Sequence, residues 1–129
     1  MLKYVHPMLI LTTLVLTLPA LSGQGLYKKI SPACVEILVG GRLDGSGAIV
    51  CPSGLVLTAC HVIRKQSKQY EALSQQLGRK PLSLVATYRG SDLALLKLPA
   101  SDKPYPALPL AREIPPEGKP VFLLGSPIF

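Results

Sequence analysis

The sequence predicts an all-β domain, either a small barrel or a sandwich. Its 129 residues fit one domain, and its 48% apolar and 16% charged residues are typical of a folded chain. Short apolar runs are separated by turn residues, and the chain holds 11 glycines and 13 prolines. Proline at this density disfavours a helical bundle, because it lacks a backbone donor and clashes inside helices. We expect roughly six or seven short strands at even spacing.

The first 22 residues are expected to form a secretory signal peptide, which is not part of the fold. Lys3 supplies a positive charge, and an uncharged apolar run spans 8–18. A proline and the small residues Ala20 and Ser22 then give a cleavage-site pattern. The apolar run is shorter than the roughly 18 residues of a spanning helix, which disfavours the alternative, an uncleaved membrane anchor. The prediction is a secreted or periplasmic protein that meets the membrane only through this segment.

The remaining part, residues 23–129, is basic. It carries 13 Lys and Arg (the 14 of the whole chain less Lys3) against 7 Asp and Glu, a net charge of +6. Positive charge of this size suggests a nucleic-acid partner, through neutralisation of phosphates. However, the basic residues are scattered and aromatic residues for base stacking make up only 5%. The sequence therefore favours a solvated basic surface and no nucleic-acid partner.

The first elements expected after the signal are a lead-in and three strands. A polar lead-in over 23–30 precedes a strand over 33–39, which ends at a pair of glycines. Strands over 46–51 and 55–58 form a hairpin across Pro52-Ser53-Gly54, a turn by composition.

The middle of the chain is ambiguous. A short helical turn is expected over 59–63 and carries His61. The following stretch, 64–77, has residues that favour helix with apolar side chains at helical spacing. A competing strand over 69–74 suits the all-β context better, and both interpretations stay open.

The last part is expected to hold three strands. A turn over 78–81 precedes strands over 82–88 and 92–98, and a proline-rich crossing over 99–120 leads to a final strand over 121–124.

Cysteine usage leaves the redox framework open. Cys34, Cys51 and Cys60 in an exported chain suggest one disulfide and one leftover thiol, but pairing depends on Cα atoms lying within about 7 Å. A heme attachment site is disfavoured because Leu57 stands where the first cysteine of that motif belongs. Zinc needs three or four converging ligands, and only Cys51, Cys60 and His61 are near one another in sequence. No metal or cofactor is predicted.

One histidine and one aspartate stand where hydrolytic chemistry needs them. A serine hydroxyl is a poor nucleophile until an imidazole accepts its proton, and a carboxylate holds that imidazole in the right tautomer. His61 follows a predicted strand, and the other histidine, His6, falls in the signal. Asp92 precedes the apolar run 93–96, so we expect its carboxylate to be shielded from water. Alone, these two residues are weak evidence, because a single histidine is more often a packed or surface residue.

Three stretches around them resemble the motifs of one enzyme family. They are GSGAIV (45–50) with SGLVLTACHV (53–62), SDLALLKL (91–98) and VFLLGSP (121–127). In this order they resemble the histidine motif, the aspartate motif and the strand that closes the first barrel in trypsin-like serine endopeptidases. The HtrA/Deg branch is the most similar. Their order and spacing also agree with that family.

The resemblance implies an antiparallel six-stranded barrel, the first half of a double barrel with the active site in the cleft. His61 matches the general base and Asp92 its orienting carboxylate. The family's nucleophilic serine lies in the second barrel within a glycine-serine-glycine turn, and nothing here corresponds to it. Ser46 and Ser126 match structural positions instead. Cys60 departs from the alanine or glycine of many members, and we expect either an apolar filler or a disulfide partner.

The expected function follows from the resemblance to the first barrel of this family. Residues 23–129 would form an incomplete peptidase domain with its second barrel absent, belonging to a serine-type endopeptidase that cleaves polypeptide substrates in the cell envelope or outside the cell. By itself the chain is expected to be inactive, with an exposed wall for the missing barrel or another protein surface. An alternative is a pseudoprotease barrel that acts as a binding or regulatory module. A third hypothesis is an exported β-domain without peptidase ancestry.

Overall fold

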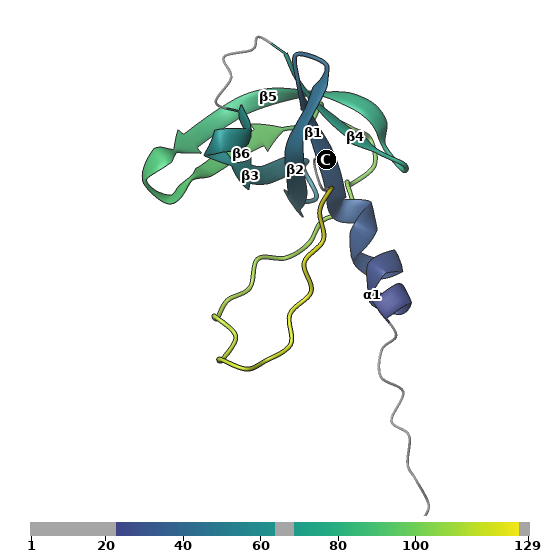
Figure 1. Ribbon diagram of the computed structural model, residues 1–129. Helices are drawn as coiled ribbons and strands as arrows, with labels where there is room; N and C mark the ends of the chain where they lie inside the picture. Colours follow the sequence, from purple (N-terminus) through teal and green to yellow (C-terminus); the bar gives the residue numbers. More distant parts are fainter. Residues whose placement is uncertain (1–22, 64–68, 127–129) are drawn as a thin grey trace, which may run out of the picture.

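The computed structural model describes residues 23–63 and 69–126 (Figure 1). The expected signal peptide lies outside the described residues, so that prediction stays untested. In the part of the chain that the structure describes, no helix has the length and apolar character to cross a membrane.

Six antiparallel strands close into a barrel in the order β1-β2-β3-β6-β5-β4, which confirms the predicted fold class. The strands are β1 (Cys34–Val39), β2 (Arg42–Cys51), β3 (Leu55–Ala59), β4 (Tyr70–Ser74), β5 (Gly78–Tyr88) and β6 (Leu93–Lys97). One α-helix, α1 (Gly23–Ile30), and three short 3₁₀ turns, η1 (Ser31–Ala33), η2 (Cys60–Ile63) and η3 (Arg89–Ser91), complete the regular structure of the described residues. In Figure 1, α1 and the loop after β6 both project from one side of the barrel.

The core fills the inside of the barrel with aliphatic side chains. Residues of β3 and β6 alternate between buried and more exposed positions, as the pleat requires. Ile37, Ile49, Val56 and Leu96 come from four different strands and are each 0% exposed. Burying each such side chain contributes about 1.5–3 kcal/mol to folding.

Residues 70–74 of the ambiguous middle segment form the strand β4, whereas 64–68 lie outside the described residues. β4 pairs with β1 on one side and with β5 on the other, so a helix there would leave the barrel open between them. Arg79 on β5 donates two hydrogen bonds to the Glu71 carboxylate on β4, at 2.7 and 2.8 Å. These bonds and the charge of Arg79 hold the pKa of Glu71 below its usual range. The contribution of this pair to stability is therefore present at neutral pH and lost as acid protonates the carboxylate.

Three local predictions are wrong. The lead-in over 23–30 is the helix α1, which buries no residue; two lysines in its last turn complement the helix dipole. The turn expected over 78–81 lies at 75–77 instead, where the Ser74 hydroxyl accepts the Leu77 N–H at 3.1 Å, and β5 already begins at Gly78.

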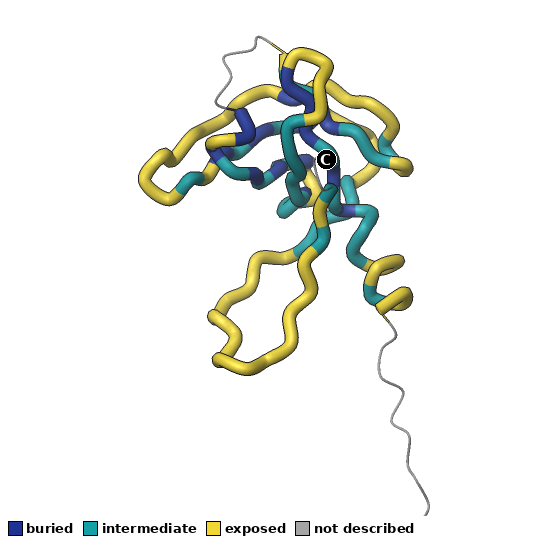
Figure 2. The backbone as a smooth tube through the Cα atoms, viewed as in Figure 1, coloured by how far each residue is buried: buried dark blue, intermediate teal, exposed yellow. Residues whose placement is uncertain are grey.

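The final strand expected over 121–124 is also absent: the described residues after β6 form no regular element. The physical reason is that β4 closes the barrel on β1, so no free edge remains for a seventh strand. Residues 109–123, here called the arm, are exposed throughout, as the yellow loop in Figure 2 shows. The arm presents large apolar side chains to solvent: Leu110, Ile114, Val121, Phe122 and Leu123.

The contrast between core and arm gives a stability prediction. We expect Leu96→Ala to lower the free energy of unfolding by about 2–5 kcal/mol, because it leaves a cavity at the centre of the barrel. The matched change Leu110→Ala, at a side chain that is 67% exposed, should stay within about 0.5 kcal/mol. Chemical denaturation followed by circular dichroism measures both. Equal effects of the two changes would contradict the described core.

Candidate active site

His61 and Asp92 come together because their strands are neighbours in the barrel. β3 pairs with β6 antiparallel, and Ala59 at the end of β3 lies opposite Leu93 at the start of β6. His61 follows Ala59 on η2, and Asp92 directly precedes Leu93. Residues 31 positions apart in sequence therefore meet at one end of the barrel.

The two side chains are joined by a short hydrogen bond. Nδ1 of His61 lies 2.5 Å from Oδ2 of Asp92, and the other carboxylate oxygen, Oδ1, accepts the backbone N–H of His61 at 2.8 Å. The carboxylate therefore holds both the ring and the backbone of the same histidine. This two-point attachment sets the plane and direction of the imidazole.

The backbone of Asp92 is itself anchored. It adopts the left-handed conformation, with φ 53° and ψ 42°, which aspartate tolerates better than most residues. Its N–H donates to the carbonyl of Arg89 at 3.2 Å, and its carbonyl accepts the N–H of Cys60 at 3.0 Å. η2 and η3 are thus tied to each other through Asp92.

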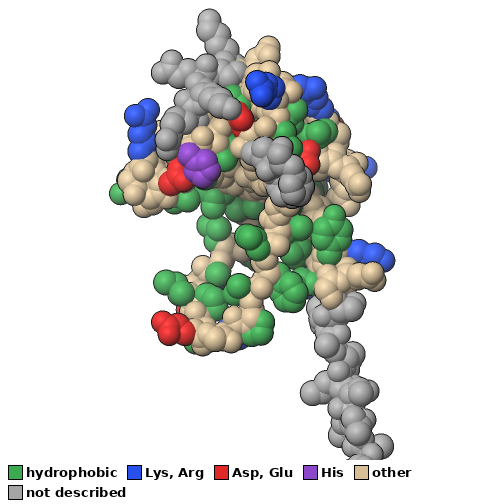
Figure 3. Space-filling view, in the orientation of Figure 1, with side chains coloured by type: hydrophobic (Ala, Val, Ile, Leu, Met, Phe, Trp, Pro, Cys, Tyr) green, Lys and Arg blue, Asp and Glu red, His purple; other side chains and the backbone are tan. Residues whose placement is uncertain are grey.

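The hydrogen-bond geometry determines where the ring proton resides. An ionised carboxylate only accepts hydrogen bonds, so the neutral imidazole carries its proton on Nδ1 and leaves the lone pair of Nε2 available. The His61 side chain is 59% exposed, and Figure 3 shows the histidine (purple) at the surface. A neutral imidazole with an accessible Nε2 can accept a proton from an incoming hydroxyl.

One electrostatic expectation is wrong. The Asp92 carboxylate is not shielded from water, since its side chain is 47% exposed. The apolar run that follows alternates in and out of the barrel instead of covering the residue before it. Solvent therefore reaches nearly half of this side chain in the described structure.

Asp92 also borders a cavity of about 410 Å³. Cys60, Tyr70, Thr87 and Arg89 are among its other lining residues, and the sequence singled out none of the last three. Thr87 and Arg89 lie five and three residues before Asp92 in sequence, whereas Tyr70 on β4 reaches this cavity only because the barrel closes. The Tyr70 hydroxyl donates to the carbonyl of Ile63 at 3.4 Å, which links β4 to the end of η2.

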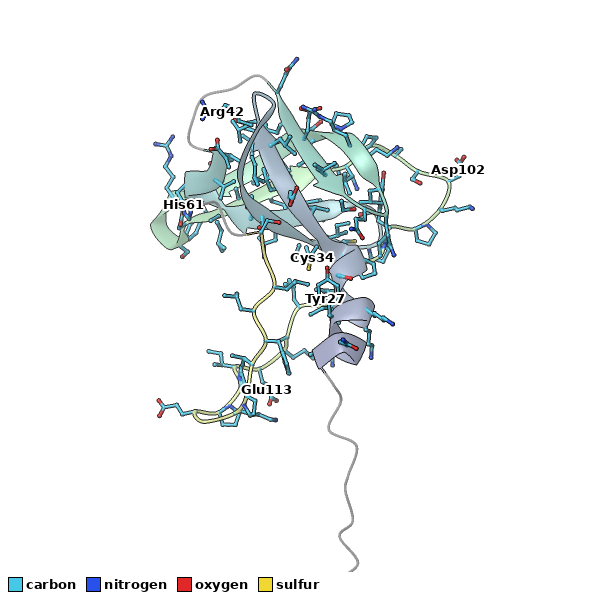
Figure 4. All side chains as sticks on the ribbon, turned by 45° about the vertical axis from the view of Figure 1, so that its right-hand side comes forward. Tyr27, Cys34, Arg42, His61, Asp102 and Glu113 are labelled. Carbon is cyan, nitrogen blue, oxygen red and sulfur yellow. The ribbon has the colours of Figure 1, made fainter. Side chains whose placement is uncertain are left out.

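The two serines of the family-like motifs lie in a different network. The Ser126 N–H donates to the Ser46 hydroxyl at 2.7 Å, and the Ser126 hydroxyl donates to Glu36 at 2.8 Å. Both serines line a cavity of about 490 Å³ that has neither His61 nor Asp92 in its wall. Figure 4 labels Tyr27 and Cys34 of this cavity, and they lie apart from His61. These bonds agree with a structural role for both serines.

The three cysteines are all free thiols, so the suggested disulfide does not form. Cys34 lies opposite Ala48 on β2, three residues short of Cys51, which separates the two cysteines by roughly 10 Å along the strand. Burial raises the pKa of Cys34, whereas hydrogen bonds from Ser53 lower the pKa of Cys51. Cys60 is buried at 8% exposure and serves as a small core residue.

The anchoring of Asp92 leads to a prediction about its replacement. Asp92→Ala should lower the free energy of unfolding by about 1–2 kcal/mol, because alanine resists the left-handed backbone and leaves the His61 N–H without its acceptor. Asp92→Asn should cost less, since asparagine tolerates this conformation and still offers a carbonyl oxygen. Urea denaturation of the two variants checks the order. Equal losses would show that neither the backbone conformation nor the N–H bond at this position matters.

Comparison with known proteins agrees with this architecture. A family model described as a trypsin-like peptidase domain matches residues 45–129. Two curated proteins, each named "Probable membrane transporter protein MamO", are 38% identical to this chain over 85 residues. They come from Paramagnetospirillum magneticum and Magnetospirillum gryphiswaldense. The match covers 62% of this chain but only 13% of either relative.

A solved structure shows the same fold. The crystal structure of the MamO protease domain from Magnetospirillum magneticum, in its apo form, superposes with a TM-score of 0.52 at 32% identity. The superposition covers 64% of this chain and 46% of that one. The barrel, the order of its motifs and the family match lead to one assignment. The chain belongs to the trypsin-like peptidase domain family.

Proposed function

We propose that this chain supplies the general base and the orienting carboxylate of a serine-type endopeptidase. The single observation that carries the proposal is the bond between Nδ1 of His61 and Oδ2 of Asp92, in which the His61 side chain remains 59% exposed. Membership of the trypsin-like peptidase family supports it, because the motifs around His61 and Asp92 resemble those that carry the base and the carboxylate in that family.

In the proposed reaction, Nε2 of His61 takes the proton of a serine hydroxyl as that oxygen attacks a peptide carbonyl. Asp92 keeps the other ring nitrogen protonated and stabilises the imidazolium that forms. His61 then returns the proton to the leaving amine, and water hydrolyses the acyl-enzyme by the same route. In this reaction the two residues act only in proton transfer and in orienting the imidazole.

The nucleophile and the oxyanion donors are proposed to come from a second barrel beyond these 129 residues. The two motif serines, Ser46 and Ser126, are already bonded within the network of Glu36. Losing one oxyanion donor costs roughly 3–4 kcal/mol of transition-state stabilisation, and lacking the nucleophile removes the covalent route. The isolated chain is therefore proposed to be inactive.

Export to the periplasm or the medium is part of the same proposal. Its support is the charged start, apolar run and small residues of the first 22 positions. The substrates would then be proteins of the cell envelope or secreted proteins. Recovery of the protein from the cytosol with residues 1–22 still attached would contradict this location.

A second candidate, a binding or regulatory module without peptidase activity, is favoured by one observation. The relatives are named as probable membrane transporters, and the matched part is 13% of their length. A peptidase-like barrel within such proteins can bind a partner without cleaving it.

An activity assay separates the two candidates. The purified 129-residue chain should leave unfolded casein intact. A longer gene product that continues past Phe129 into a glycine-serine-glycine segment should cleave it, and His61→Ala should lower its kcat by about 10⁴-fold or more. Asp92→Asn should lower kcat by about 10⁴-fold, because an amide favours the wrong tautomer. Lys103→Ala, at an exposed loop position, is the matched control.

Three outcomes would overturn these statements. Casein cleavage by the 129-residue chain that disappears with His61→Ala would show that the chain is active alone. Cleavage by the longer product that survives His61→Ala unchanged, or no cleavage at all, would remove the peptidase proposal and favour the module.

A further inference from the structure

Gly45 on β2 lies directly against η2, the turn that carries His61. A Cβ atom built at this position would stand 2.6 Å from Cγ2 and 2.9 Å from Cγ1 of Val62. Real Cβ atoms essentially never approach another atom this closely. The backbone of Gly45 is outside the left-handed region, so its conformation does not require glycine. Glycine is required at position 45 only because there is no room for a Cβ atom.

Val62 cannot move aside easily. It is 7% exposed and belongs to the hydrophobic core. Its branched side chain has one torsion angle, and both of its methyl groups are close to the missing Cβ. Relief of a clash here therefore requires a shift of η2 relative to β2, and η2 is only four residues long with His61 next to Val62.

The opposite side of η2 is tied to Asp92. The N–H groups of Cys60 and His61 donate to the carbonyl and Oδ1 of Asp92, at 3.0 and 2.8 Å. η2 is thus held between a packing contact on β2 and hydrogen bonds to the start of β6. A shift away from β2 alters the distance and angle between the imidazole and its carboxylate.

We propose that Gly45 is a positioning residue for the candidate base. Because Gly45 has no side chain, Val62 can pack directly against β2, and this packing places η2 where His61 bonds to Asp92. This role rests on the proposed function, since it concerns the same pair. Gly45 touches no reacting atom and acts only through Val62.

The test measures the tautomer of His61 in the 129-residue chain. Nitrogen-15 shifts of the imidazole distinguish a ring protonated on Nδ1 from the tautomer mixture of a free imidazole, and His61→Ala assigns the signals. The unaltered chain should show the Nδ1 tautomer. Gly45→Ala should shift the signals towards the mixture. Adding Val62→Ala should restore them, because it removes both clashing methyl groups and leaves only the Val62 Cβ, 3.4 Å away.

Gly47 provides the matched control. A Cβ there would lie 2.9 Å from Cγ1 of Val56, 3.1 Å from the Leu57 carbonyl and 3.2 Å from Cδ1 of Ile37, all in the barrel wall. Gly47→Ala should therefore overpack the core and lower stability while the imidazole signals stay unchanged. A purely structural role for Gly45 would make the two glycine variants behave alike.

The outcomes separate the two proposals. Unchanged imidazole signals in Gly45→Ala, or no recovery in the double variant, would overturn the role of Gly45. Should Gly45→Ala fail to fold, Val62→Ile can replace it, because it adds a methyl group to the Val62 side of the same contact. This variant is expected to shift the imidazole signals towards the tautomer mixture, and unchanged signals would also overturn the role of Gly45. The tautomer readout needs no peptidase activity, so failure of the casein assay leaves this inference standing, and the reverse holds too.

Discussion

The antiparallel pairing of β3 with β6 is the contact on which the rest of the molecule depends. It places Ala59 opposite Leu93, and so brings the residues just beyond these strand ends together. The same pairing buries Val56 and Leu96 at the centre of the barrel. One set of backbone hydrogen bonds therefore serves both the stability of the core and the meeting of imidazole and carboxylate. A slip of one residue in this register would turn the core side chains outwards and separate the pair.

The candidate base is held by constraints of two kinds. Hydrogen bonds from Asp92 act on the ring and on the backbone of η2, and they are directional. Close packing of Val62 on Gly45 acts from the other side through steric exclusion. The combination holds an imidazole that is itself largely exposed, so its order does not depend on burial. That exposure leaves the ring open to solvent.

The closed barrel also explains why the arm forms no strand. With β4 paired to both β1 and β5, every strand of the described barrel has two neighbours. The arm therefore has no sheet edge to join, and its apolar side chains Leu110, Ile114 and Phe122 face solvent. Beyond the arm, Ser126 bonds to Ser46 and Glu36 and so returns the chain to the barrel.

The sequence by itself determined the all-β class, the hairpin around Pro52-Ser53-Gly54 and the two residues of the pair. These depend on local signals: turn composition, short apolar runs, and motifs that stay contiguous in the chain. It left the strand at 70–74 undecided, and it predicted a strand over 121–124 and a shielded Asp92 that the structure does not have. Only the tertiary structure decided these points, because pairing partners, barrel closure and solvent exposure are set by residues distant in sequence. The need for glycine at position 45 arises in the same way, from a valine seventeen positions later that packs against it.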